Sequence, residues 1–153
     1  MLSDDSFRRR LQHVIAALEV WAAEMEPFAT IEHGFIDDAW RISAVPRVET
    51  ACPFEIILRP DQKFDIRVDD EIYEDQPLDA LTDIPQIVRS IANGGILIRR
   101  WTGQATGLVY NVETVIDLPG TNEGRFERPN PDAPPLEDVE LEAELETFVP
   151  YRR

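Results

Sequence analysis

The chain has 153 residues, the length of one ordinary domain. Thirty acidic residues against fifteen basic ones give a net charge of −15, which disfavours a nucleic-acid binder that neutralises phosphates and equally disfavours docking on an anionic membrane. No apolar stretch approaches the length of a membrane span. A single cysteine, Cys52, excludes an intrachain disulfide and a cysteine-based zinc site, and it favours a cytoplasmic location.

Residues 4–26 have the pattern of an amphipathic helix. Ser3 is suited to cap its amino end and Pro27 to stop it. The helical phase predicts that Trp21 lies in the core and that Arg9 points to solvent. The apolar face comprises Phe7, Leu11, Val14, Ile15, Leu18, Trp21, Ala22 and Met25.

Strands are predicted over residues 35–69. The clearest unit is a β-hairpin of 54–59 and 64–68, because both segments are rich in apolar residues and the intervening 60–63 contains proline and aspartate, which favour turns. The following segment, 69–83, has seven acidic residues and no basic one, which is typical of a solvated negative surface.

A second helix is predicted over 84–92, where apolar residues share one face and Asn93-Gly94 provides a stop. A second hairpin follows, formed by 96–102 and 106–118, since both segments alternate between apolar and polar residues.

After Pro119 the composition changes. Prolines and glycines without apolar periodicity predict a linker. In 139–146 apolar residues alternate with glutamates, which favours a strand, whereas Leu, Ala and Glu individually favour a helix, so both structures stay open. We expect this segment to dock in an ordered way, on its own chain or on a second copy, against basic residues such as those of 8–10 or 99–100.

These elements predict an α+β fold: an antiparallel, possibly curved sheet of about five strands, with a long N-terminal helix and a second helix packed on it. Residues 1–119 are predicted to form one domain, and 120–153 a proline-rich linker with an acidic C-terminal segment. The order of elements, the size and the acidity resemble those of the small acidic chaperones of type III secretion. That resemblance implies a chaperone-like role, but it carries no diagnostic residues and assigns no position a function.

No catalytic or cofactor-binding constellation is evident. His13 has Ala17 and not a second ligand at its i+4 position. The only cluster of mixed ligand types is Glu32-His33 followed by Asp37-Asp38, and it favours a surface loop because a metal site there needs a loop and a strand start to converge closely. The chain has no phosphate-binding glycine motif and no nucleophile elbow. We therefore predict no catalytic residue, no metal and no cofactor.

The candidate binding residues are arginines next to tryptophans on two predicted strands, a combination enriched in binding hot spots. If the two strands are neighbours, these side chains form one surface cluster. The alternative is a structural role in the core or its rim, with the arginines paired to acids. The set is Trp40, Arg41, Arg99, Arg100 and Trp101.

Two functional hypotheses follow. The first is a non-enzymatic protein-interaction module, namely an adaptor, a chaperone-like protein or an acidic inhibitor of a basic partner. Its expected partner is another protein or a second copy of this chain. The second is a small-molecule-binding protein or enzyme with a pocket between the sheet and a helix, lined by Trp40, Trp101 and Tyr110.

Overall fold

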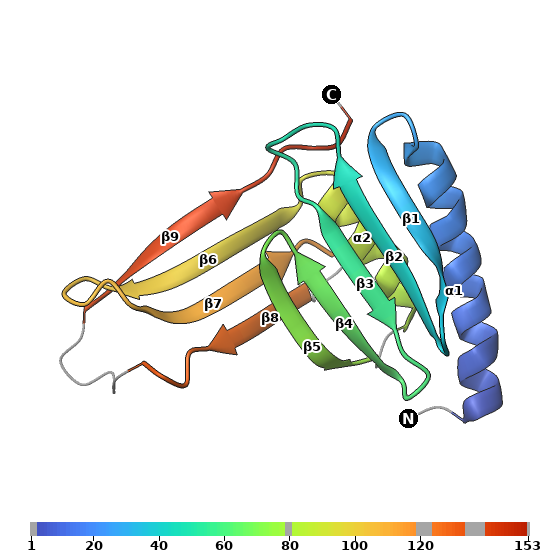
Figure 1. Cartoon of the computed structure of the whole chain (residues 1–153), viewed down its shortest axis with the longest axis horizontal. Helices are drawn as coiled ribbons and strands as arrows, with labels where there is room; N and C mark the ends of the chain where they lie inside the picture. Colours follow the sequence, from blue (N-terminus) through green and yellow to red (C-terminus); the bar gives the residue numbers. More distant parts are fainter. Residues whose placement is uncertain (1–2, 79–80, 119–123, 134–139, 153) are drawn as a thin grey trace.

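The computed structural model describes residues 3–78, 81–118, 124–133 and 140–152, which form an α+β fold with two antiparallel sheets (Figure 1). None of the helices in these ranges has the length and apolarity needed to cross a membrane. The elements are α1 (Asp4–Met25), β1 (Ala29–Ile36), β2 (Ala39–Pro46), β3 (Phe54–Leu58), β4 (Lys63–Val68), β5 (Glu71–Pro77), a 3-10 turn (Leu81–Asp83), α2 (Ile84–Ala92), β6 (Ile96–Gly103), β7 (Val109–Ile116), β8 (Gly124–Pro129) and β9 (Leu141–Thr147).

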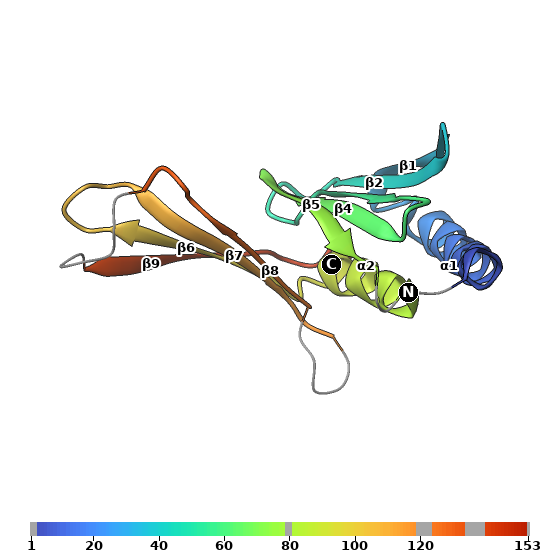
Figure 2. The same ribbon diagram turned by 90° about the horizontal axis from the view of Figure 1, so that it is seen from below.

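The first sheet is a meander in the order β1-β2-β3-β4-β5, and both helices lie against one of its faces (Figure 2). Alternate residues of its strands point to these helices; Ile42, Ile56 and Ile66 are almost fully buried there. Trp21 of α1 packs against this layer, with its ring centroid 5.9 Å from that of Phe54. The predicted long helix and its buried face are confirmed, and Ser3 caps the helix by accepting from the Ser6 amide at 3.3 Å.

The second sheet has the order β8-β7-β6-β9. Its base packs on the rest of the molecule, where Ile96, Ile98 and Ile116 are buried against the core that includes α2. Figure 2 shows the sheet extending away from the helical layer as a separate wing. The expectation of a single sheet of about five strands is therefore incomplete, since the four-stranded sheet adds to a five-stranded one.

Three strands were not expected from the sequence. β1 is a mostly exposed edge strand, so that it lacks a clean apolar alternation. In β5 the phase is inverted, because Glu71 is buried while Ile72 is exposed. Residues 71–77 of the acidic segment 69–83 are thus part of a sheet. β8 directs one apolar residue, Phe126, into the core, which is too weak a signal to distinguish it from a linker.

The open question about 139–146 is resolved in favour of a strand from Leu141 onward, since β9 pairs antiparallel with β6 over its full length. Val139 lies outside the described residues. The C-terminal end then enters the core. Tyr151 is 1% exposed, its amide donates to the carbonyl of Ala92 at 2.8 Å, and its hydroxyl donates to the carbonyl of Cys52. The segment after residue 119 thus contributes two strands to the second sheet, while the predicted boundary itself, 119–123, lies outside the described residues.

Candidate functional site

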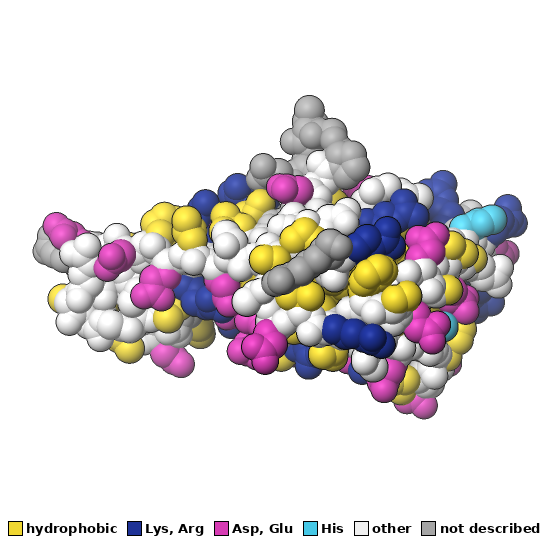
Figure 3. All heavy atoms as spheres, turned by 90° about the horizontal axis from the view of Figure 1, so that it is seen from above, with side chains coloured by type: hydrophobic (Ala, Val, Ile, Leu, Met, Phe, Trp, Pro, Cys, Tyr) yellow, Lys and Arg dark blue, Asp and Glu magenta, His cyan; other side chains and the backbone are white. Residues whose placement is uncertain are grey.

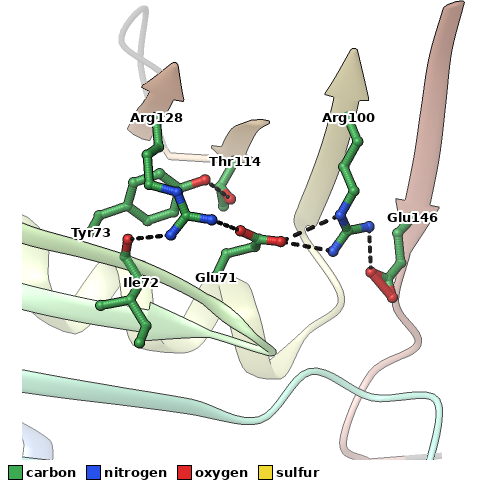
Figure 4. A network of polar contacts seen from close by, with 7 residues as sticks. All are labelled: Glu71, Ile72, Tyr73, Arg100, Thr114, Arg128 and Glu146. Atoms are coloured by element: carbon green, nitrogen blue, oxygen red, sulfur yellow. Dashed lines mark hydrogen bonds and ion pairs between the residues drawn. The ribbon is translucent and has the colours of Figure 1, made fainter. Parts of the chain in front are cut away.

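A polar network joins the two sheets (Figure 4). Glu71 of β5, 7% exposed, lies between two arginines of the second sheet. Its Oε1 accepts from Nη2 of Arg100 at 3.1 Å, and its Oε2 from Nη2 of Arg128 at 2.6 Å. Arg100 also pairs with Glu146 of β9 at 3.1 Å, and Arg128 donates to the carbonyl of Ile72 at 3.1 Å. One buried carboxylate therefore ties β5 to strands β6 and β8, and through Arg100 to β9.

Aromatic residues fill the base of this junction. The hydroxyls of Tyr73 on β5 and Thr114 on β7 are 2.8 Å apart and buried. The ring of Phe126 on β8 packs against Tyr73, with centroids 5.5 Å apart, and edge-on against Phe64, at 6.1 Å. Because burial dominates, the pKa of Tyr73 is raised, so the phenol stays neutral as a hydrogen-bonding group. These contacts hold the second sheet at a fixed angle.

The opposite side of the second sheet is covered by neither helix nor by the first sheet; we call it the outer face. Leu97 and Trp101 on β6 and Val115 on β7 are half-buried there, and Leu145 on β9 is 61% exposed. Figure 3 shows hydrophobic and basic side chains gathered along one long side of this wing. Several neighbouring apolar side chains on a sheet face that no described helix or sheet covers are typical of an interaction surface.

The centre of the outer face carries a compact charge cluster. Glu113 is 5% exposed because two arginines cover it: Nη1 of Arg99 lies 2.8 Å from its Oε1, and Nη1 of Arg125 lies 3.5 Å from its Oε2. The guanidinium of Arg99 also lies 5.8 Å from the ring centroid of Trp101. A hollow of about 420 Å³ opens beside the cluster, lined by Gly94, Gly95, Ile96, Leu97, Arg99, Val115, Asp117, Arg125 and Thr147.

The β9 edge of the second sheet has a defined orientation. The amide of Gln104 donates to the carbonyl of Glu140 at 3.0 Å. In the alternation of an antiparallel ladder, the main-chain groups of Glu142 and Glu144 then also point to β6, and those of Leu141, Ala143 and Leu145 point outward. Side chains alternate as well: Leu145 and Ala143 lie on the outer face, and Glu142 and Glu144 on the face toward the first sheet.

The opposite edge, β8, is different. The amide of Asn130 donates to the carbonyl of Tyr110 at 2.9 Å, so the outward positions of this strand are Arg125, Glu127 and Pro129. Proline has no amide hydrogen, and prolines are a common protection of sheet edges. β9 contains no proline, and no main-chain hydrogen bond between described residues uses its outward amides.

The sequence-predicted binding residues are divided between the two sheets. Trp40 lies on β2, is 2% exposed and faces the helical layer, with its ring 6.0 Å from that of His33. Arg41 points to the opposite face of the first sheet, where it pairs with Glu55 at 2.7 Å. Because β2 and β6 belong to different sheets, the expected single cluster does not form.

The other three predicted residues share β6 but not a face. Arg99 and Trp101 belong to the outer face, whereas Arg100 belongs to the junction with Glu71. The acidic C-terminal segment meets Arg100, through Glu146, on its own chain. Sequence reasoning missed Glu71, Glu113 and Arg128. The only signal for them was the proximity of opposite charges in a chain rich in both, which does not indicate which pairs meet.

The pocket proposed from Trp40, Trp101 and Tyr110 is not assembled. Trp101 faces outward from the second sheet, Tyr110 lies on the face toward the first sheet, and Trp40 lies under the first sheet. A groove of about 460 Å³ lies elsewhere, between α1 and the loop ends of the first sheet, and includes none of the three. It is lined by Asp4, Phe7, Arg8, Leu11, Gln12, Ile15, Phe35, Asp38 and Pro60.

The thiol of Cys52 is fully buried, and its Sγ lies 3.3 Å from the carbonyl of Pro53. Burial, followed by the charge of Asp69, raises the pKa of this thiol to about 12. Within the described ranges, no three His, Cys, Asp or Glu side chains gather closely enough to hold a metal ion.

Comparison with known proteins provides no family assignment. No protein-family model, no curated protein and no solved structure matches this chain.

Proposed function

We propose that this protein is a non-enzymatic protein-interaction module that binds its partner through the wing formed by the second sheet. The observation that carries the proposal is the outer face: a sheet surface with Leu97, Trp101, Val115 and Leu145 accessible and a hollow beside them. On this face the apolar side chains surround the ion pairs of Glu113 with Arg99 and Arg125. Tryptophan and arginine are frequent hot-spot residues of binding surfaces.

The anchoring of the wing supports the same conclusion. Glu71, Arg100 and Arg128 connect the base of the wing to the first sheet, and Tyr151 fixes the chain that follows β9. A surface held in place by its own fold loses little conformational entropy when a partner binds. The wing therefore has the rigidity that a docking platform needs.

Affinity capture with variants tests this proposal. Trp101→Glu and Leu145→Glu place a charge on the outer face, while Val20→Glu places one at a 59% exposed apolar position on α1 and serves as the matched control. We expect both wing variants to lose the partners that wild-type protein captures from its own cells, measured by quantitative mass spectrometry. The control is expected to retain them. Circular dichroism establishes that each variant is folded. Equal capture by all four proteins contradicts the proposal.

A further inference from the structure

We propose that the partner binds as an additional strand along the edge of β9, and that the added segment alternates between basic and apolar residues. This inference rests on the proposed function and specifies how the partner binds. It is carried by three features of β9 (Leu141–Thr147): outward main-chain groups, an acidic side and an apolar side.

The main chain provides the first argument. Leu141, Ala143 and Leu145 direct their amide and carbonyl groups away from β6. Unpaired main-chain groups on a regular edge strand are a template for another strand, and strand addition is a common mode of peptide recognition. β9 pairs with β6 in continuous register without a bulge, so its edge is regular.

The side chains provide the second argument. Glu142 and Glu144 are exposed on one side of β9, and neither forms an ion pair within the part of the chain that the structure describes. Figure 3 shows acidic side chains, with some hydrophobic ones among them, along the other side of the wing. A strand added to β9 places alternate side chains beside these glutamates and the others beside Leu145. Basic residues suit the first set of positions and apolar residues the second.

The same charges exclude β9 of a second copy as the occupant. Antiparallel pairing of two β9 strands about a two-fold axis perpendicular to the sheet keeps the glutamates on a common face. Glu142 and Glu144 then oppose those of the other copy, and like charges directly opposite each other are destabilising. A basic partner has the charge that complements these glutamates. The chain's net charge of −15 also increases the association rate of such a partner.

The other sheet edges are less suitable. β8 carries Pro129 at an outward position. β5 packs beside β8 and contains Asp75 with a φ of 56°, which interrupts its regularity. β1 packs beside α1. Among the described strands, β9 therefore combines a regular edge with complementary chemistry on both sides.

Synthetic peptides test the mode of binding. The probe is a capped peptide of alternating lysine and valine with the length of β9, seven residues. It has three matched controls. In the first, glutamate replaces every lysine. The other two are N-methylated on alternate amides, one on the odd-numbered set and one on the even-numbered set. We expect the basic peptide to bind and the glutamate peptide not to bind. One N-methylated set is expected to weaken binding about tenfold or more, because it removes the donors that face β9, and the other set to leave it nearly unchanged.

Variants of the protein locate the added strand. Ala143→Pro removes an outward amide of β9 without breaking a hydrogen bond to β6, and Glu127→Pro makes the matched change on the edge of β8. We expect Ala143→Pro to weaken the lysine–valine peptide about tenfold or more and Glu127→Pro to leave its affinity nearly unchanged. The double variant Glu142→Gln, Glu144→Gln is expected to bind the lysine–valine peptide more weakly. The salt dependence of that binding is also expected to decrease.

The outcomes separate this inference from the proposed function. Absence of binding by the basic peptide, equal effects of the two N-methylated sets, or equal effects of the two prolines overturns strand addition on β9. A protein that self-associates through β9, detected by sedimentation and abolished by Ala143→Pro, also overturns it in favour of a second copy. If Trp101→Glu abolishes cellular partners while Ala143→Pro does not, the wing binds a partner but not as an added strand.

Discussion

Glu71 and Arg100 join the two sheets: Oε1 of the carboxylate accepts from Nε and Nη2 of the guanidinium at 3.3 and 3.1 Å. Arg128 binds the other oxygen of the same carboxylate. The glutamate is almost inaccessible to water and is the acid that both arginines share. A single side chain of the first sheet thus binds two strands of the second sheet.

Glu71→Gln is expected to destabilise the protein by about 1–3 kcal/mol, because an amide accepts through one oxygen and leaves an arginine without a charged partner. Glu74→Gln, an exposed change on the same strand, is the control and is expected to alter stability by less than about 0.5 kcal/mol. Urea unfolding followed by circular dichroism measures both. Coincident midpoints for the two variants contradict a role of Glu71 in holding the sheets together.

Asp69→Asn is expected to stabilise the protein near neutral pH. Burial, and then the charges of Glu146 and Asp70, raise the pKa of the Asp69 carboxyl above its ordinary value of 3.8, so its charged form is penalised in the folded state. Asparagine also tolerates the φ of 54° at this position.

The pH dependence of that gain has a definite sign. A raised folded-state pKa means that the folded protein binds the proton more tightly, so the penalty is absent below the ordinary aspartate pKa and complete above the raised one. The advantage of Asp69→Asn should shrink as the pH falls through this window, in urea midpoints measured at a series of pH values. An advantage that grows on acidification is inconsistent with this origin.

The thiol of Cys52 is expected to be unreactive in the folded protein. With its pKa raised to about 12 and its surface fully buried, it has almost no accessible thiolate at pH 8. Labelling with a thiol-specific chromogenic disulfide should be negligible in buffer and complete in denaturant. At intermediate denaturant concentrations the labelling rate should follow the fraction of unfolded protein. Rapid labelling of the native protein contradicts this description.

Trp21→Ala is expected to cost about 3–5 kcal/mol of stability, since the side chain is 5% exposed and packs on Phe54. Arg9→Ala, on the exposed side of the same helix, should change stability by less than about 0.5 kcal/mol. Similar unfolding midpoints for the two variants mean that the helix does not present this face to the sheet.

The elements with a strong apolar period were predictable: α1, α2 and the hairpins β3–β4 and β6–β7 occur where the sequence places them. β9 was ambiguous because local preference and periodicity conflict, and pairing with β6 supplies the partner that decides for a strand. β5 was missed since Glu71 is buried and Ile72 exposed, a reversal that only its long-range arginine partners explain.

The wing was predicted only in parts. Arg99 and Trp101 were identified as binding candidates, and they lie together on the outer face. Trp40 could not be distinguished from them by sequence. A tryptophan next to an arginine on a strand gives the same local sequence pattern whether the tryptophan faces the core or solvent. Which strands form a common sheet depends on contacts between distant segments, and the linker composition around β8 concealed one of them.

Hydrogen exchange at the outward amides of β9 tests the central claim most directly. In the free protein, the amides of Leu141, Ala143 and Leu145 should exchange rapidly, while those of Glu142 and Glu144, which are bonded to β6, are protected. With the alternating lysine–valine peptide in excess, the three outward amides should become protected and those of β8 should not change. Protection confined to another edge, or no change at Leu141, Ala143 and Leu145, contradicts the wing as a strand-binding platform.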